Sequence, residues 1–307
     1  MLTTPILLLT FNRPLFARQV LEQIRKVRPK QLFIACDGPR EGNVEDIQKC
    51  AATRAMLTMI DWECQVFTWF RNENRGCGRG PAEAITWFFE HVEEGIILED
   101  DCVPDPSFFG FCQTLLTHYR HQTDIYMITG TNSLNTWRSG HSSYIFTLMG
   151  GSLGWATWRR AWSDFDYEMK SWKTEVGRQR VRETLKHQSI YHHFTTEFDK
   201  IADSVPNDVW DFQWFFARLA NNGKTLVSTA NLIKNIGFNA EATHSIYEND
   251  IRANLKLYEV DTKLKHPSHM VDSLFDWVVY ERIINPNPKS LWKKARLKAL
   301  RLLFTHN

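Results

Sequence analysis

The sequence has no long apolar run. Its opening stretch, Ile6–Leu9, is brief and follows no basic residue. A membrane span needs about 18 consecutive apolar residues and a secretion signal needs a basic leader, so we expect neither. Paired cysteines are missing too, since the cysteines at 36, 50, 64, 77, 102 and 112 form no CxxC motif. This pattern excludes a zinc knuckle or a disulfide framework, and we expect reduced thiols in a cytoplasmic protein.

Strong net charge is also lacking. A net charge of +2 at pH 7 gives no basic surface for nucleic acid. The apolar fraction of 43% and the charged fraction of 23% are typical of globular proteins. Aromatic residues, in contrast, are abundant, with 12 Trp, 20 Phe and 8 Tyr. They suit a packed core, and they also suit a carbohydrate site, where flat rings stack on sugars.

Strand and helix signals alternate through the first 130 residues. Apolar runs predict strands over 5–11, 32–36, 64–70 and 95–98. Helical spacing predicts helices from Pro14, over 44–60 and from Pro81, the last after a glycine-rich loop at 74–80. Repeated β-α-β units imply a Rossmann-like α/β fold, with a mostly parallel sheet and helices on both faces.

Beyond residue 130 the pattern is irregular. Gly150–Trp155 reads as a loop, and helices are predicted near 155–163, 174–187, 190–202 and 209–221. We expect one domain over 1–285, with a nucleotide-binding half at about 1–130 and an acceptor half at about 131–285.

Polar segments follow each of the four predicted strands. They occupy 10–13, 37–40, 71–79 and 99–101. Ligands of open α/β sheets bind beyond the carboxyl ends of the strands. We therefore expect these four segments to converge on one crevice.

The last of these segments is the acidic triplet Glu99-Asp100-Asp101. Adjacent carboxylates repel one another, and a divalent cation relieves that repulsion; hard oxygen ligands suit Mg²⁺ or Mn²⁺. Neighbouring side chains on a strand point in opposite directions, so the three cannot all bind one ion. A solvated acidic turn is the alternative interpretation.

The glycine-rich loop carries Arg71, Arg75 and Arg79. Backbone amides of such a loop can approach a phosphate, and arginine adds bidentate contacts. The loop matches no Walker or dinucleotide-binding motif, so by itself it is a weak indication.

The acidic segment and three later motifs resemble the N-acetylglucosaminyltransferase I family. Ile96–Asp101 followed by Pro104–Phe109 is similar to that family's Glu-Asp-Asp and Pro-Asp-Phe-Phe segments. Gly151–Trp155 resembles its Gly-Leu-Gly-Trp loop, Trp210–Trp214 its Trp-Asp-Asp-Trp, and Thr243–Ser245 its Ser-His-Gly loop. The order is kept over about four-fifths of the chain. The wider resemblance is to compact bacterial glycosyltransferases sometimes labelled hemolytic-protein-like.

This resemblance implies a GT-A fold and a metal-dependent transferase that moves a sugar from a nucleotide sugar to a glycan or lipid-linked acceptor. By position, Asp101 would bind Mn²⁺ or Mg²⁺ and Asp211 would be the catalytic base. With the strand-end segments and the glycine-rich loop, the donor-binding candidates are Thr10, Asn12, Arg13, Asp37, Arg75, Arg79, Glu99, Asp100, Gly154, Trp155, Trp210 and His244. Two positions differ from the family: Phe212 replaces a second Asp, and Asn12 replaces an Asp before Arg13.

The proposed base has a rival three residues earlier. An inverting transferase needs a carboxylate to accept the proton of the acceptor hydroxyl. Asp211 lies between Trp210 and Trp214, whereas Asp208 also reads as the N-cap of the predicted helix. Either carboxylate remains open as the base at this point.

Two other functions compete with glycosyl transfer. Sugar nucleotidyltransferases share the sheet and use acidic metal sites, but they usually carry a basic glycine-rich loop after the first strand. Here Asn12-Arg13-Pro14 follows that strand. A carbohydrate-binding protein with a degenerate site is the second alternative, and the intact acidic triplet argues against it.

The tail from 286 to 307 is basic and amphipathic. Between Lys289 and Phe304 it carries six basic residues and no acidic one, interspersed with Leu, Trp and Phe. Such a helix could contact an anionic membrane surface, or it could pack on the protein itself or on a second subunit.

Overall fold

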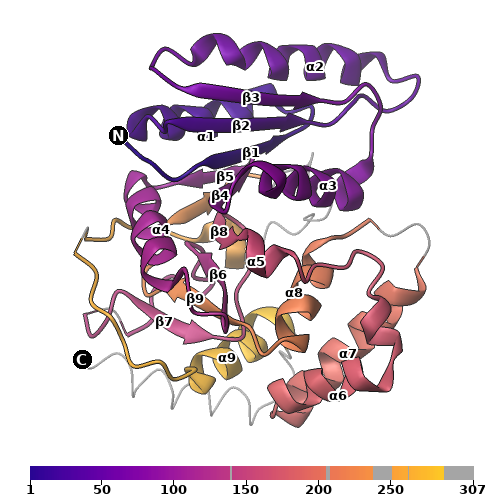
Figure 1. Ribbon diagram of the computed structural model, residues 1–307, viewed down its shortest axis with the longest axis vertical. Helices are drawn as coiled ribbons and strands as arrows, with labels where there is room; N and C mark the ends of the chain where they lie inside the picture. The colour runs from indigo at the N-terminus through magenta and orange to yellow at the C-terminus, as the bar shows by residue number, and fades with distance from the viewer. Residues whose placement is uncertain (139, 205–207, 238–250, 262, 287–307) are drawn as a thin grey trace.

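The computed structural model describes residues 1–138, 140–204, 208–237, 251–261 and 263–286. The chain builds an eight-stranded mixed sheet in the order β3-β2-β1-β4-β8-β6-β9-β7. Helices cover both of its faces (Figure 1). This arrangement confirms the predicted Rossmann-like α/β sheet flanked by helices.

The first half of the sheet is parallel, as predicted. Its strands are β1 (Ile6–Thr10), β2 (Gln31–Cys36), β3 (Gln65–Phe70) and β4 (Glu94–Glu99). β1 pairs in parallel with both β2 and β4, and β2 pairs in parallel with β3. The order β3-β2-β1-β4 is that of nucleotide-binding doubly wound sheets.

The helices that join these strands differ from prediction at their ends. They are α1 (Pro14–Val27), α2 (Val44–Arg54) and α3 (Gly76–His91). The helix predicted over 44–60 ends at Arg54 and continues as a 3₁₀ turn over Ala55–Met59. The helix predicted from Pro81 begins at Gly76, so the glycine-rich segment forms its first turns and Pro81 lies inside it. The reason is a cap from another strand, described below.

The second half extends the same sheet. Its strands are β6 (Ile125–Thr129), β7 (Tyr144–Thr147), β8 (Trp155–Trp158) and β9 (Lys224–Ser228). β8 lies antiparallel between β4 and β6, so one sheet combines strands of both predicted halves. The prediction of a helix over 155–163 is wrong for its first residues. Trp155–Trp158 forms a buried strand, and only Arg159–Trp162 is helical, as α5.

The remaining helices lie mainly in the second half. They are α4 (Pro106–Tyr119), α6 (Glu175–Thr184), α7 (Gln188–Asp203), α8 (Asp211–Ala220) and α9 (Ser273–Val279). α6 and α8 fall within the predicted ranges, and α7 extends slightly beyond its predicted range of 190–202 at both ends. A small antiparallel pair, β5 (Cys102–Pro104) with β10 (Ile233–Asn235), closes over the end of β4.

The central strand β1 is buried on both faces. Ile6 and Leu8 belong to the core that packs against α1 and α4. Leu7 and Leu9 belong to the core that packs against α3, α5 and α8. This alternation explains the unbroken apolar run in the sequence, because a strand covered by helices on both sides has no polar face.

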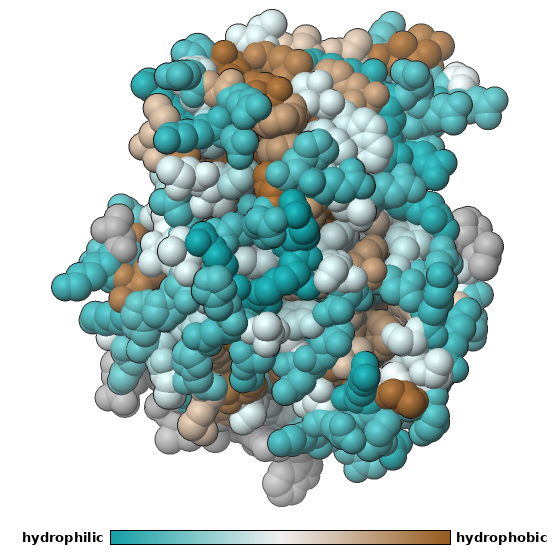
Figure 2. Space-filling model, viewed as in Figure 1, coloured by the Kyte–Doolittle hydropathy of each residue, from teal (hydrophilic) through white to brown (hydrophobic). Residues whose placement is uncertain are grey.

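The surface in Figure 2 is largely hydrophilic. Hydrophobic residues gather at the end that carries α2 and β3, where Val44, Ile47 and Val66 are exposed. Among the described residues, no helix is both long and apolar enough to cross a membrane. The predicted basic helix over 286–307 lies outside the described residues from 287 onward.

Candidate functional site

A cavity of about 600 Å³ opens at the carboxyl ends of β1, β2 and β4. The structure brings all four predicted polar segments to its wall. Of the donor-binding candidates, those that line it are Thr10, Asn12, Arg13, Asp37, Glu99 and Asp100. Other residues of the predicted segments also line it, among them Phe11, Arg40, Asn74 and Cys77, although they were not chosen individually as donor-binding candidates. Glu45 and Lys49 of α2 line it too, and they lie outside the predicted segments. A second cavity, of about 920 Å³, lies at the far end of α8, and no predicted site residue lines it.

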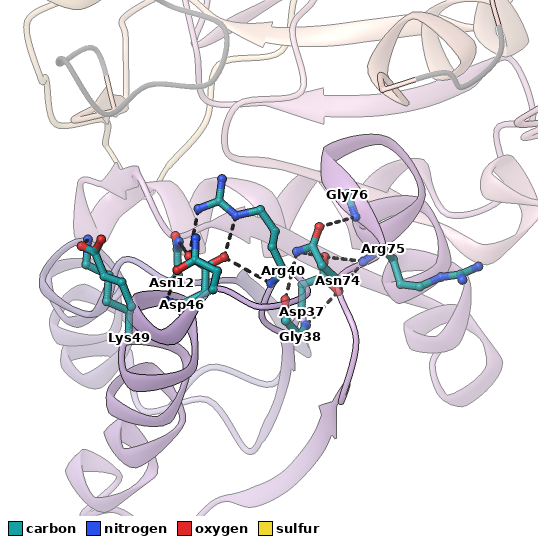
Figure 3. A network of polar contacts seen from close by, with 11 residues as sticks. Asn12, Asp37, Gly38, Arg40, Asp46, Lys49, Asn74, Arg75 and Gly76 are labelled. Carbon is teal, nitrogen blue, oxygen red and sulfur yellow. Dashed lines mark hydrogen bonds and ion pairs between the residues drawn. The ribbon is translucent and has the colours of Figure 1, made fainter.

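Asp37 joins the end of β2 to the start of α3. Its carboxylate accepts hydrogen bonds from the backbone N–H of Gly38 at 2.9 Å and of Arg75 at 3.0 and 3.1 Å. Asn74 Nδ2 donates to the same carboxylate at 3.1 Å (Figure 3). Burial raises the pKa of Asp37, and the backbone donors work against that rise. Asp37 therefore caps α3 from a neighbouring strand, which is why that helix begins at Gly76.

A second carboxylate, Asp46, binds two residues that line the cavity, Asn12 and Arg40. It lies in the first turn of α2, almost fully buried, and accepts hydrogen bonds from Asn12 Nδ2 at 2.7 Å and from Arg40 Nε at 2.6 Å (Figure 3). Arg40 Nη2 donates to its other oxygen at 2.9 Å. The Arg40 hydrogen bond lowers the pKa of Asp46 to about 2, against its desolvation. Asn12, Arg40 and Asp46 thus form one fixed unit at the wall of the cavity.

The acidic triplet lies at the end of β4, where one arginine holds two of its carboxylates. Arg13 donates through Nη2 to Asp100 and through Nη1 to Asp101 Oδ2, the latter at 3.1 Å. Burial alone lowers the pKa of Arg13, but the two carboxylates outweigh it and raise the pKa. Burial raises the pKa of Asp100 to about 7, although Arg13 acts against this rise.

Glu99 is the last residue of β4 and lines the cavity together with Asp100. Burial, followed by the charges of Asp101 and Asp100, raises its pKa to about 8. The charge of Asp211 contributes to the same rise, although Asp211 itself does not line the cavity. Within the triplet, Asp100 and Asp101 therefore share Arg13 as their partner, whereas burial and the neighbouring carboxylates act on Glu99.

Asp211 and Asp208 both lie beside the start of α3. Asp211 is the first residue of α8 and is exposed. Asp208 lines the cavity, and its backbone carbonyl accepts a hydrogen bond from Cys77 Sγ at 3.1 Å. The N-cap of α8 is Trp210, so the predicted capping role of Asp208 is wrong.

The tryptophans of the two later motifs are in the core. Trp155 is fully buried on β8, and its ring stacks on that of Trp210 with centroids 5.9 Å apart. Trp210 is 5% exposed, and Trp214 packs on the same cluster. Gly154 precedes Trp155 with a φ of +62°, a conformation that favours glycine. Gly154, Trp155 and Trp210 do not line the cavity, and the two tryptophans belong to the core beside the start of α8.

The three arginines of the glycine-rich segment go to different places. Arg71 lines the cavity, donates from Nη1 to Glu83 at 2.6 Å, and its Nη2 has no hydrogen-bond partner within the described part of the chain. Arg75 pairs with the same glutamate at 3.2 Å. Arg79 pairs with Glu168 at 2.7 Å outside the cavity, so the structure does not bring it to the candidate site. His244 lies outside the described residues.

The residues of this site would hold a metal ion only if a bound ligand supplied further oxygen atoms to its coordination shell. The described residues hold no group of three or more His, Cys, Asp or Glu side chains arranged to bind a cation. Mg²⁺ and Mn²⁺ commonly bind one or two carboxylates and complete their shell with substrate phosphates and water. The oxygens of Asp101 suit that role, because the residue is partly exposed at the end of β4.

Comparisons with known proteins leave the family open. No protein-family model matches the chain, and no curated protein matches it. Among solved structures, it is similar to HddC from Yersinia pseudotuberculosis, with a TM-score of 0.29 and 10% identity over 47% of this chain. The match spans 60% of HddC, less than two thirds of that protein. It is also similar to a UDP-glucose pyrophosphorylase complexed with UDP-glucose, with a TM-score of 0.37 and 10% identity over 75% of this chain and 91% of that one. Likenesses this weak assign no function.

Proposed function

We propose that this protein is a glycosyltransferase that moves a sugar from a nucleoside diphosphate sugar to a glycan or lipid-linked acceptor. A UDP-sugar such as UDP-GlcNAc is the favoured donor. The observation that carries the proposal is the meeting of Glu99 and Asp100 with the ends of β1 and β2 in one cavity. Asp101 follows them directly in the chain, and the charge of Asp211 contributes to the raised pKa of Glu99. A cavity at this edge of an open α/β sheet is where nucleotides bind.

Different residues of the site are proposed to bind the nucleoside, the diphosphate and the metal ion of the donor complex. The fixed unit of Asn12, Arg40 and Asp46 presents an amide and a guanidinium to the nucleoside. Arg71 also lines the cavity, and its guanidinium would attract a phosphate bound there. Asp101 would hold Mn²⁺ or Mg²⁺ together with the diphosphate, and the bound cation would supply positive charge that stabilises the leaving group.

The reaction is proposed to invert the configuration at the anomeric carbon of the donor sugar. The acceptor oxygen bonds to that carbon as its bond to the diphosphate oxygen breaks, and Asp211 accepts the acceptor's proton. The nucleoside diphosphate leaves with the electron pair. A base positioned in this way contributes about 10²–10⁴-fold to the rate. Trp155 and Trp210 stack behind Asp211 and hold the start of α8 in place.

A donor screen tests the proposal. Thermal unfolding is measured with a panel of nucleotide sugars, each with and without Mn²⁺, and the stabilising donors are then incubated with candidate acceptors. We expect a Mn²⁺-dependent rise in Tm with a UDP-sugar, acceptor-dependent release of UDP, and an inverted anomeric signal in the product by NMR. Formation of UTP from the UDP-sugar and pyrophosphate would instead identify a nucleotidyltransferase. Binding without turnover would identify a carbohydrate-binding protein.

A further inference from the structure

Arg13 lies at the junction between the nucleotide cavity and the acidic triplet. It precedes α1, and its backbone carbonyl accepts hydrogen bonds from Phe16 and Ala17. Its guanidinium lies over the Phe16 ring, 5.7 Å from the ring centroid, and also lines the cavity. The backbone of Arg13 is therefore fixed, while its charged end lies between two possible sets of oxygen partners.

One set of partners is already engaged. The two terminal nitrogens of Arg13 are bound one to Asp100 and the other to Asp101. The side chain of Asp100 is 3% exposed and that of Asp101 15%, whereas that of Arg13 is 26% exposed and faces the cavity. Asp100 is thus neutralised inside the protein, and Asp101 loses part of the negative charge that a divalent cation would need.

A guanidinium and a divalent cation compete for these oxygens. Arginine stays protonated at any ordinary pH, so it cannot give way by losing its charge. Two cations within a few ångströms of each other repel strongly at low dielectric. For a metal to bind Asp101, the guanidinium must lose its hold on that carboxylate. A diphosphate offers arginine an equally suitable planar, bidentate partner.

We propose that Arg13 is an internal counter-ion that holds Asp100 and Asp101 until a nucleoside diphosphate draws its guanidinium away, so that the divalent cation binds with the nucleotide and not before it. This inference rests on the proposed function. Nucleotide and cation are then coupled: each raises the affinity for the other by the same factor. The chain without donor does not hold the metal, because its own arginine takes the metal's place.

Metal binding measured without catalysis tests this. Mn²⁺ is titrated into the full chain and followed by EPR, in the absence of nucleotide, with uridine and with UDP. The variants are Arg13→Gln, Arg13→Lys and, as a matched control, Arg18→Gln, whose arginine lies on α1 and pairs with Glu22 at the surface. Circular dichroism and thermal unfolding establish that each variant is folded.

We expect the wild type and Arg18→Gln to bind Mn²⁺ weakly alone or with uridine, and at least tenfold more tightly with UDP. Arg13→Gln should bind Mn²⁺ without nucleotide at least tenfold more tightly than the wild type, with Arg13→Lys between them. If Arg13→Gln does not fold, the test uses Mn²⁺ binding by Arg13→Lys and the difference between UDP and uridine in the wild type.

Two outcomes overturn the inference in distinguishable ways. If the wild type without nucleotide binds Mn²⁺ as tightly as Arg13→Gln does, Arg13 is no barrier, and the proposed metal-dependent transferase stands. If the wild type binds UDP but no Mn²⁺ under any condition, the metal part of the proposed function fails, and the counter-ion role fails with it.

Discussion

The carboxylate of Asp37 accepts the backbone N–H of Arg75 at 3.0 and 3.1 Å, although 38 positions separate the two residues. This contact makes the end of β2 the cap of α3. It places the first turn of α3 against the cavity, because Gly76 and Cys77 follow Arg75 directly and line the wall. Helix stability and cavity shape therefore depend on one side chain.

Asp37→Ala is expected to lower both the stability of the protein and the affinity of the cavity for UDP. Removing a helix cap costs about 1 kcal/mol of unfolding free energy. Because the cap also sets the cavity wall, UDP affinity should fall by about tenfold, as calorimetry would measure. The matched control is Thr174→Ala, which removes the cap of α6, where Thr174 Oγ accepts the backbone N–H of Gly177 at 3.1 Å. It should lose similar stability in urea and keep its UDP affinity; equal UDP binding by both variants would contradict the prediction.

Asp46 should contribute to stability in a pH-dependent way. Its pKa falls from 3.8 to about 2 on folding. A carboxylate whose pKa is lower in the folded state than in the unfolded state stabilises the fold fully at pH values above its unfolded pKa. This stabilisation is lost as the pH falls from about 4 through about 2. Asp46→Ala should therefore lower the unfolding free energy at pH 7 by on the order of 2 kcal/mol, and the loss should shrink in acid.

Denaturant unfolding at several pH values measures this effect. The control is Asp61→Ala, which removes an exposed partner of Arg25. Surface ion pairs contribute little, so the control should unfold much like the wild type. A deficit for Asp46→Ala that stays constant from pH 7 to pH 2 would show that packing, not charge, causes it.

Substitution of Asp211 and Asp208 should show which of the two carboxylates is the catalytic base. Asp211→Asn should lower turnover by at least about 10² while donor affinity stays unchanged, because the base acts on the acceptor. Asp208→Asn should alter turnover far less. Steady-state UDP release and UDP calorimetry measure the two quantities. A larger loss of turnover in Asp208→Asn than in Asp211→Asn would make Asp208 the catalytic base. Unchanged turnover in both variants would indicate a retaining reaction.

A side chain at Gly237 is expected to displace the carboxylate of Asp101. A Cβ at this position would lie 2.2 Å from Asp101 Oδ2. Gly237→Ala should therefore displace that carboxylate and reduce Mn²⁺-dependent UDP binding at least tenfold, with little change in Tm. Gly151→Ala is the control, since a Cβ there meets nothing within 4 Å. Calorimetry with UDP and Mn²⁺ compares the two, and identical affinities would place the metal away from Asp101.

Local pattern was enough to find much of the fold. The apolar runs of β1, β2 and β4 are buried, so their hydrophobicity is continuous. β3 is a partly exposed edge strand, but its aromatic and β-branched residues mark it, and all four positions are readable within one or two residues. The acidic triplet was equally visible, because charge directly after a buried strand is a local feature. Short strands in the second half were not readable: Trp155–Trp158 has a residue pattern that helix and strand share.

The sequence by itself determined which strands carry polar ends, since parallel connections bring those ends to one edge. Only the tertiary structure decided which side chains meet there. Arg13 reaches Asp101 across 88 positions, and Asn12 reaches Asp46 across 34. Such pairs depend on the order in which strands are laid side by side, and no periodicity along the chain encodes that order. The same holds for Arg79, which belongs to the right segment yet turns outward to Glu168, because a helix, not a loop, carries it.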